Sequence, residues 1–224
     1  GGRRLDPENE LVIKRVIHTT ADFDYVDNLA FSDHAVEKGI AALRAGCDIV
    51  TDTQMAKAGI NKTILASLGG EVHCFMSDAD VAAEAKERGV TRAFVSMERA
   101  AALEKPCIFA IGNAPTALFS LEALMEAGKL HPALIIGVPV GFVNVVESKE
   151  RIIEAAAAPY IVARGRKASS SSTSVRHWGI TASLGRSAPA CCICTMRETS
   201  SARGGVRAKS WLEHTTATPA ECAC

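Results

Sequence analysis

The 224-residue sequence lacks several features that indicate common classes of function. Its 25 Lys and Arg residues balance its 25 Asp and Glu residues, so net charge provides no bulk attraction to nucleic acid or to an anionic membrane. No apolar run is long enough to span a bilayer, and the start, "GGRRLDPENE", has no apolar core of a signal peptide. The start also lacks an initiator Met, so we expect an N-terminally truncated chain. These absences favour a cytoplasmic protein that binds neither nucleic acid nor membrane.

Motifs for nucleotide, metal and triad chemistry are also missing. The chain has neither a G-x-G-x-x-G nor a P-loop, no two histidines have metal-ligand spacing, and no catalytic Ser-His-Asp or Cys-His set can be assembled. The tail holds "CCIC" and "CAC", but a zinc site needs well-spaced pairs in a segment that can pack. We expect no bound metal. Cys47, Cys74 and Cys107 are interpreted as small buried hydrophobes of a reduced protein.

Composition divides the chain after Lys167. Residues 1–167 alternate apolar runs with amphipathic segments rich in Ala and Glu. Residues 168–224 are rich in Ser, Thr, Ala, Arg and Cys, contain no Asp, and show neither a helix nor a strand period. We therefore expect one domain over 1–167, followed by an irregular, poorly ordered tail over 168–224.

The first part predicts an α/β fold. Helical patterns separate short apolar runs, with Ser32 or Asp33 as one N-cap, Pro115 near a helix start and Gly89 at a helix end. Repeated βα units predict a parallel sheet with helices on both faces. The five predicted strands are 47–52, 71–76, 107–112, 133–138 and 159–165, and the main helical patterns cover 32–46, 78–89, 114–128 and 143–157.

Three loops that follow strands in this scheme are rich in small residues. They cover residues 51–60, 111–118 and 137–141, the last reading "GVPVG". Glycine lets backbone approach a ligand, and the N–H groups that open the following helix favour an anion. In open α/β sheets ligands bind at the carboxyl ends of strands, so the three loops predict one crevice. The alternative is that these residues only make tight turns.

Basic residues near the ends of the predicted elements suggest the charge of a ligand. Arginine suits a two-pronged grip on carboxylates, so a ligand with several carboxylates around an apolar body fits this pattern. The alternative is that these side chains form ordinary solvated surface. The residues are Arg92, Lys149, Arg164, Arg166 and Lys167.

His18 lies among the apolar residues Val12, Val16 and Ile17. Histidine is the side chain best suited to moving a proton near neutral pH. From the residues alone, a partly buried structural histidine is the preferred interpretation, and a catalytic role is the alternative. His34, His73 and His131 are interpreted as structural in the same way.

Five stretches together resemble one known family. "RVIHTTADFDY", "GCDIVTDTQMAKAGI", "IFAIGNAPTAL", "PALIIGVPVGFVNVVESKE" and "YIVARGRK" are similar to precorrin-8X methylmutase. The resemblance implies a flavodoxin-like, doubly wound, five-stranded parallel sheet of order 2-1-3-4-5 and a homodimer with its active site near the interface. It also implies an isomerase of cobalamin biosynthesis that moves a methyl group between neighbouring carbons of the corrin macrocycle. No cofactor is implied.

The resemblance also assigns roles to residues. His18, in "RVIHTT", inherits the catalytic position and handles a proton of the macrocycle. Arg92, in "TRAF", becomes a contact for a substrate carboxylate, and Met55 and Val140 become apolar walls. The remaining substrate contacts implied in the loops and at the basic positions are Thr51, Gly112, Asn113, Thr116, Gly141, Lys149, Arg164 and Arg166.

The chain departs from this family at both ends. The family normally has an additional N-terminal segment with a serine that contacts substrate, and it continues past "RGRK" with "GGS" and a closing helix. Two alternatives therefore stand beside the isomerase: a corrinoid-binding protein without catalysis, and an unrelated α/β enzyme for a small anionic ligand such as a phosphate ester. The residues do not distinguish a cobalt-free substrate from one that contains cobalt.

Overall fold

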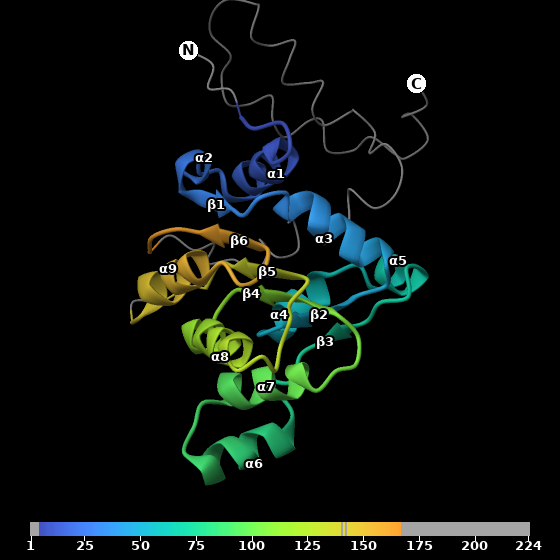
Figure 1. The fold of residues 1–224 in the computed structure, drawn as a ribbon, viewed down its shortest axis with the longest axis vertical. Helices are drawn as coiled ribbons and strands as arrows, with labels where there is room; N and C mark the ends of the chain where they lie inside the picture. Colours follow the sequence, from blue (N-terminus) through green and yellow to red (C-terminus); the bar gives the residue numbers. More distant parts are fainter. Residues whose placement is uncertain (1–4, 140, 142, 167–224) are drawn as a thin grey trace, which may run out of the picture. The chain divides into compact units, whose positions relative to one another are not determined.

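The computed structural model describes residues 5–139, 141 and 143–166 (Figure 1). Within these ranges the chain forms one sheet of six strands with helices on both faces. The strands are β1 (Leu29–Phe31), β2 (Asp48–Thr51), β3 (Val72–His73), β4 (Cys107–Ile111), β5 (Leu134–Gly137) and β6 (Tyr160–Ala163). The helices are α1 (Glu10–Thr20), α2 (Tyr25–Asn28), α3 (Ala35–Arg44), α4 (Gln54–Gly59), α5 (Lys62–Ser67), α6 (Ala79–Arg88), α7 (Arg92–Ala101), α8 (Pro115–Glu126) and α9 (Val145–Ala155).

The strands lie in the order β1-β6-β5-β4-β2-β3. All five predicted apolar runs contain a strand, and these five pair in parallel. The prediction of five strands is nevertheless wrong, because β1 adds a sixth strand that pairs with β6 in the antiparallel direction. β1 has only three residues, Leu-Ala-Phe, all half-buried, and so short an apolar run does not distinguish a strand from other structure.

Successive residues of the central strands face opposite sides of the sheet, and each side is covered by helices. On one side Ile108 and Ala110 of β4 pack in a cluster with residues of α1, α3, α4 and α5. On the other side Phe109 and Ile111 pack with residues of α7, α8 and α9. In Figure 1, α1 and α3 lie above the sheet and α7 and α8 lie below it. Burial on both sides explains why the strand sequences are continuously apolar.

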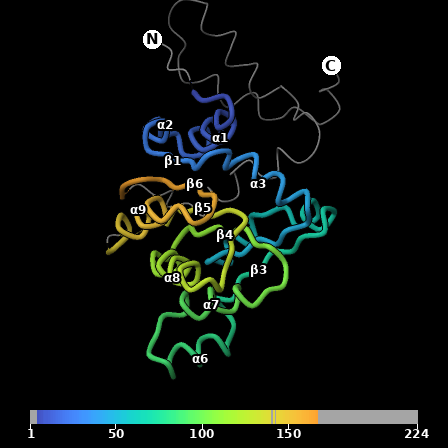
Figure 2. The backbone as a smooth tube through the Cα atoms, viewed as in Figure 1, coloured from blue at the N-terminus to red at the C-terminus, as the bar shows by residue number. Residues whose placement is uncertain are grey.

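α6 lies outside α7 and forms a third layer (Figure 2). Val81 and Ala85 of α6 pack against Val95 of α7, and Arg99 makes ion pairs with Asp80 and Glu84. The α7 segment was not among the predicted helices. Its start is nevertheless capped, because the hydroxyl of Thr91 accepts the N–H of Phe94 at 3.2 Å.

The predicted N-cap of α3 is wrong. Neither Ser32 nor Asp33 occupies that position, which belongs to His34 in the left-handed conformation with φ of 55°. The hydroxyl oxygen of Ser32 instead accepts the backbone N–H of Tyr160 at 2.9 Å, which ties the loop before α3 to β6. The predicted end of α6 is confirmed, with Gly89 left-handed at φ of 65°. No helix in the described part of the chain is long and apolar enough to cross a membrane.

A buried carboxylate organises the edge of the sheet where the parallel strands begin. Asp48 is 5% exposed; its Oδ1 accepts the N–H of Glu71 at 2.8 Å, and its Oδ2 lies 3.1 Å from Nε2 of His73. Lys105 Nζ lies 3.8 Å from Oδ1 of Asp48. The structural interpretation of His73 is therefore confirmed: its ring bridges the short strand β3 to β2.

We expect Asp48→Ala to lower the free energy of unfolding by about 2–4 kcal/mol, because it leaves the N–H of Glu71 and the His73 ring without their acceptor. Chemical denaturation measures this change. Asp33→Ala is the matched control, since Asp33 is exposed and we expect a change below about 0.5 kcal/mol. Equal effects of the two substitutions would contradict this account of the amino edge.

Candidate active site

The loops that leave β2, β4, β5 and β6 all emerge at the carboxyl edge of the sheet, because these strands are parallel. The loop after β2 leads to α4 and α5 on one face, and the loop after β4 leads to α8 on the other. The chain therefore turns away in opposite directions from two neighbouring strands. Such a divergence is where open α/β sheets form binding crevices.

Asp52 occupies the point of divergence. It follows β2 directly, is 1% exposed, and accepts three backbone N–H groups from the loop after β4. Its Oδ1 accepts from Gly112 at 2.9 Å, and its Oδ2 accepts from Asn113 and Ala114 at 2.7 Å each. Burial raises the pKa of Asp52, and the three donors act in the opposite direction.

This arrangement limits the prediction that the loop over 111–118 offers N–H groups to an anion, because donors that precede α8 are used inside the protein. Three of those donors are paired with Asp52 inside the protein. The side chains of Asn113 and Thr116, by contrast, are exposed at the start of α8, so they remain available for contact with a ligand. Asp52 was not predicted as a site residue. Its signal in the sequence was a carboxylate directly after a buried strand, in "CDIVTD".

The segment that ends β2 and continues into α4 contains both buried and exposed residues. Thr51 is 1% exposed, and its hydroxyl lies 3.2 Å from the carbonyl oxygen of Thr53 and 3.3 Å from that of His73. The prediction that Thr51 contacts substrate at the surface is therefore corrected. Met55, on α4, is 60% exposed, which agrees with its predicted place on an apolar wall.

The "GVPVG" loop after β5 needs glycine at its end. Gly141 has φ of 139°, and an added Cβ would lie 3.2 Å from Cγ2 of Val145. Val143 is 77% exposed, so the loop presents apolar surface close to the start of α9. Val140, the other predicted wall residue, lies outside the described residues. The predicted functional and turn-forming roles of the glycine thus both remain compatible with Gly141.

Lys149 differs from its prediction as a basic residue at the end of an element. It lies within α9 and is fully buried, and its Nζ donates to the carbonyl oxygen of Gly165 at 3.1 Å. Burial lowers the pKa of this lysine to about 8. The ammonium group therefore supports the turn after β6 from below the surface, and a direct surface contact with substrate is not available to it.

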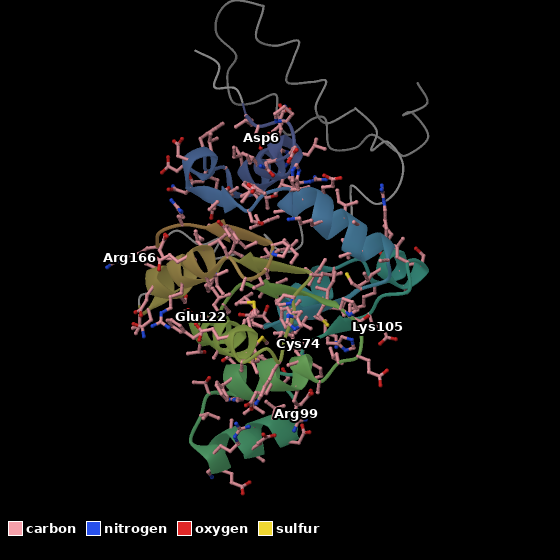
Figure 3. The ribbon with its side chains drawn as sticks, in the orientation of Figure 1. Asp6, Cys74, Arg99, Lys105, Glu122 and Arg166 are labelled. Carbon is pink, nitrogen blue, oxygen red and sulfur yellow. The ribbon has the colours of Figure 1, made fainter. Side chains whose placement is uncertain are left out.

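The arginines provide the exposed positive charge at this edge. Arg164 and Arg166 are exposed just beyond β6, and Figure 3 labels Arg166 there. Arg92 is exposed at the first position of α7, where the helix dipole disfavours a cation. Its guanidinium has no ion pair or hydrogen bond within the described part of the chain. A bound anion would satisfy it.

β1 explains how the N-terminal segment reaches the same edge. Because β1 is antiparallel to β6, its first residue, Leu29, pairs with Ala163 at the carboxyl end of β6. The backbone N–H of Arg164 donates to the carbonyl oxygen of Asn28 at 2.7 Å. The segment that leads from the last turn of α1 into β1 therefore lies beside the exit of β6, and His18 belongs to that last turn.

His18 is exposed, and its imidazole makes no hydrogen bond or ion pair with any residue that the structure describes. The interpretation of His18 as a partly buried structural histidine is therefore wrong. An exposed imidazole on the segment that leads to β1, with exposed arginines and apolar side chains at the carboxyl edge, agrees with the resemblance in "RVIHTT" and "GNAPTAL".

Comparison with known proteins decides the family. The model of the family described as precorrin-8X methylmutase matches residues 1–176. The chain belongs to the precorrin-8X methylmutase family. It is 47% identical over 171 residues to the cobalt-precorrin-8 methylmutase of Salmonella typhimurium, covering 75% of this chain and 78% of that protein. The corresponding enzyme of Leptospira interrogans is 45% identical over 166 residues, covering 71% of this chain and 76% of that protein.

A solved structure agrees with this assignment. The precorrin-8X methylmutase of Thermus thermophilus superposes with a TM-score of 0.72 at 35% identity, over 82% of this chain and 90% of that chain. Methylmutases are isomerases, so the chain is an isomerase of the kind that functions in cobalamin biosynthesis.

One groove of this methylmutase adjoins the start of α8. It has a volume of 470 Å³ and lies between the turn that joins α6 to α7 and the first turns of α8. Thr116, a predicted substrate contact, lines it together with Thr91, which directly precedes Arg92. The lining residues are Gly89, Val90, Thr91, Phe94, Thr116, Phe119 and Ser120. Within the described ranges, no group of three or more His, Cys, Asp or Glu residues could hold a metal.

The buried position of Lys149 predicts a pH dependence of stability. Below pH 8 the lysine is protonated in both the folded and the unfolded chain, and the cost of burying its charge is fully present. Between pH 8 and its ordinary pKa of 10.5, only the unfolded chain holds the proton, so stability rises with pH. We expect this gain to be about 1–3 kcal/mol larger in the wild type than in Lys149→Met.

Denaturation curves at a series of pH values measure the difference. The thiols of Cys47 and Cys107 act in the opposite direction, since burial raises their pKa to about 12 and about 11, but they are common to both proteins. Lys38→Met, at an exposed position on α3, is the control and should follow the wild-type curve. Parallel curves for the wild type and Lys149→Met would contradict the assigned burial of the charge.

Proposed function

We propose that this protein converts precorrin-8X to hydrogenobyrinate, or cobalt-precorrin-8 to cobyrinate. The bond from the methyl group to one ring carbon breaks as its bond to the neighbouring carbon forms, so the shift is intramolecular and needs no external electron acceptor. The observation that carries the proposal is His18: an exposed imidazole without a hydrogen-bond or ion-pair partner among the described residues, on the segment that leads to β1.

His18 is proposed to hold or donate a proton on the macrocycle during the shift. A neutral imidazole accepts a proton and an imidazolium donates one near neutral pH, which suits a change in ring conjugation. An unpaired side chain is free to make this contact, whereas His73 is held by Asp48 and His34 lies beside Glu8 and Glu37. His18 thus differs from these two histidines in its availability.

The substrate's carboxylate arms are proposed to bind the exposed arginines. Arg92 is unpaired within the described part of the chain, and Arg166 extends beyond β6 (Figure 3). The alternative of a phosphate-ester enzyme loses part of its support, because that hypothesis relied on N–H donors in the loops after the strands, which include the loop after β4. Asp52 takes three of those donors, and its negative charge disfavours a phosphate at the same place.

Exposed apolar side chains support a large, partly apolar ligand and a second subunit. Met55, Val143 and Val146 are 60%, 77% and 38% exposed, and Phe23, between α1 and α2, is 76% exposed. These side chains offer apolar surface that a ligand or a second subunit can cover. We propose a homodimer whose interface lies near the site, a flavodoxin-like relationship on the order β3-β2-β4-β5-β6 of the parallel strands, and a cytoplasmic location, consistent with three buried free thiols.

His18→Ala is expected to lower kcat by about 100- to 10,000-fold, because it removes the group that handles the proton. Binding of hydrogenobyrinate should persist, since the arginines and apolar walls are unchanged. Absorbance of the macrocycle measures both quantities. His131→Ala is the matched control, as His131 is also exposed but precedes β5 at the opposite edge. Wild-type turnover by His18→Ala would sink the proposed mechanism, and tight binding without any turnover by the wild type would favour the non-catalytic alternative.

Arg92→Gln is expected to raise KM by about 10- to 100-fold with a smaller change in kcat, because it removes a charge-assisted hydrogen bond to a substrate carboxylate. Steady-state kinetics with precorrin-8X separate the two parameters. Arg44→Gln is the control, since Arg44 is exposed in the last turn of α3, which leads to the amino edge. An unchanged KM for Arg92→Gln would remove Arg92 from the binding site.

A further inference from the structure

Two buried aspartates lie at the two ends of the same strand. Asp48 begins β2 and is 5% exposed, and Asp52 directly follows β2 and is 1% exposed. Both accept backbone N–H groups from other parts of the chain. Asp48 joins β2 to β3 at the amino edge, whereas Asp52 joins β2 to the loop after β4 at the carboxyl edge. Each aspartate is thus a buried hydrogen-bond acceptor, and the two lie at opposite ends of the strand.

The contacts of Asp52 fix three consecutive peptide groups. Oδ1 takes the N–H of Gly112, and Oδ2 takes the N–H groups of Asn113 and Ala114, all within 2.9 Å. These groups belong to the short segment between the end of β4 and Pro115, the first residue of α8. Since each bonded N–H fixes the plane of its peptide, the whole connection has one defined path.

The segment held in this way carries exposed side chains. Asn113 is exposed within the 112–114 segment that Asp52 holds, and Thr116 is exposed one turn later, where it lines the groove beside α8. α8 itself is packed in the core through Leu118 and Leu121, so it does not need Asp52 to stay on the sheet. The carboxylate therefore acts on the direction of the exposed groups more than on the packing of the helix.

We propose that Asp52 is a positioning residue of the methyl shift, which holds the 112–114 segment so that Asn113 and Thr116 meet the substrate. This inference rests on the proposed function. By occupying the N–H groups of the 112–114 segment, Asp52 also prevents a substrate carboxylate from binding these groups, and this leaves the arginines as its partners. The macrocycle is thereby held in one orientation relative to His18.

Two substitutions remove the hydrogen bonds of Asp52 to different extents. Asp52→Ala removes all three acceptors. Asp52→Asn retains one oxygen, and its NH₂ group can replace Oδ1 at the loss of the Gly112 bond alone. We expect KM for precorrin-8X to rise about 10- to 100-fold in Asp52→Ala and less in Asp52→Asn, because misplaced binding groups weaken the complex. Hydrogen exchange of the 112–114 amides should quicken in the same order.

Asp48→Ala is the matched control. It removes a buried carboxylate from the other end of β2 and is expected to lower stability while KM and the exchange of the 112–114 amides stay at wild-type values. Formate supplies a second test, because it fits the space left in Asp52→Ala and can accept the same three N–H groups. At about 100 mM, formate should lower the raised KM of Asp52→Ala by at least about threefold and leave the KM of Asp48→Ala unchanged.

The outcomes separate this inference from the proposed function. Equal changes of KM in Asp48→Ala and Asp52→Ala, or faster exchange of the 112–114 amides with KM unchanged, would overturn the positioning role. If Asp52→Ala does not fold, Asp52→Asn carries the same comparison. A wild-type protein that turns over neither precorrin-8X nor cobalt-precorrin-8 contradicts the proposed function instead, and the affinity for hydrogenobyrinate then replaces KM in the test of Asp52.

Discussion

Burial of both faces of the sheet is the constraint on which the rest of the structure depends. Phe109 and Ile111 point into one helical layer, and Ile108 and Ala110 point into the other, so no face of the central strands is open to a ligand. Polar chemistry is therefore confined to the two edges. Because five strands run in parallel, their exits collect at one edge, and the antiparallel β1 brings the N-terminal segment to that edge as well.

Buried charges define the two edges. A buried ionised group is costly unless hydrogen bonds satisfy it, so each such group fixes the backbone that it contacts. Asp48 fixes β3, Asp52 fixes the start of α8, and Lys149 contacts the turn after β6. The groups left for a substrate are then those without an internal role, which include the imidazole of His18 and the guanidinium of Arg92. The buried charges therefore fix the loops, and the polar groups that they do not use are available to a substrate.

Much of the fold could be predicted, and the failures have physical reasons. The five apolar runs and the stop of α6 at Gly89 were evident, because continuous burial and a left-handed glycine leave strong local patterns. β1 was missed because three half-buried residues leave none. Within the site, Met55, Asn113 and Arg92 are exposed as expected of contacts, but Thr51 and Lys149 proved to be buried. Exposure depends on what packs over a residue, which no local pattern records.

The sequence by itself determined the alternation of strands and helices and, through stretches such as "GNAPTAL", membership of the precorrin-8X methylmutase family. Tertiary structure alone decided which polar groups are used internally and which stay free. Asp52 finds its donors 60 to 62 positions further along the chain, and Leu29 pairs with Ala163 across most of the described chain. Partners so distant meet only when the strands assemble, because a hydrogen bond requires contact in space and not proximity in the chain.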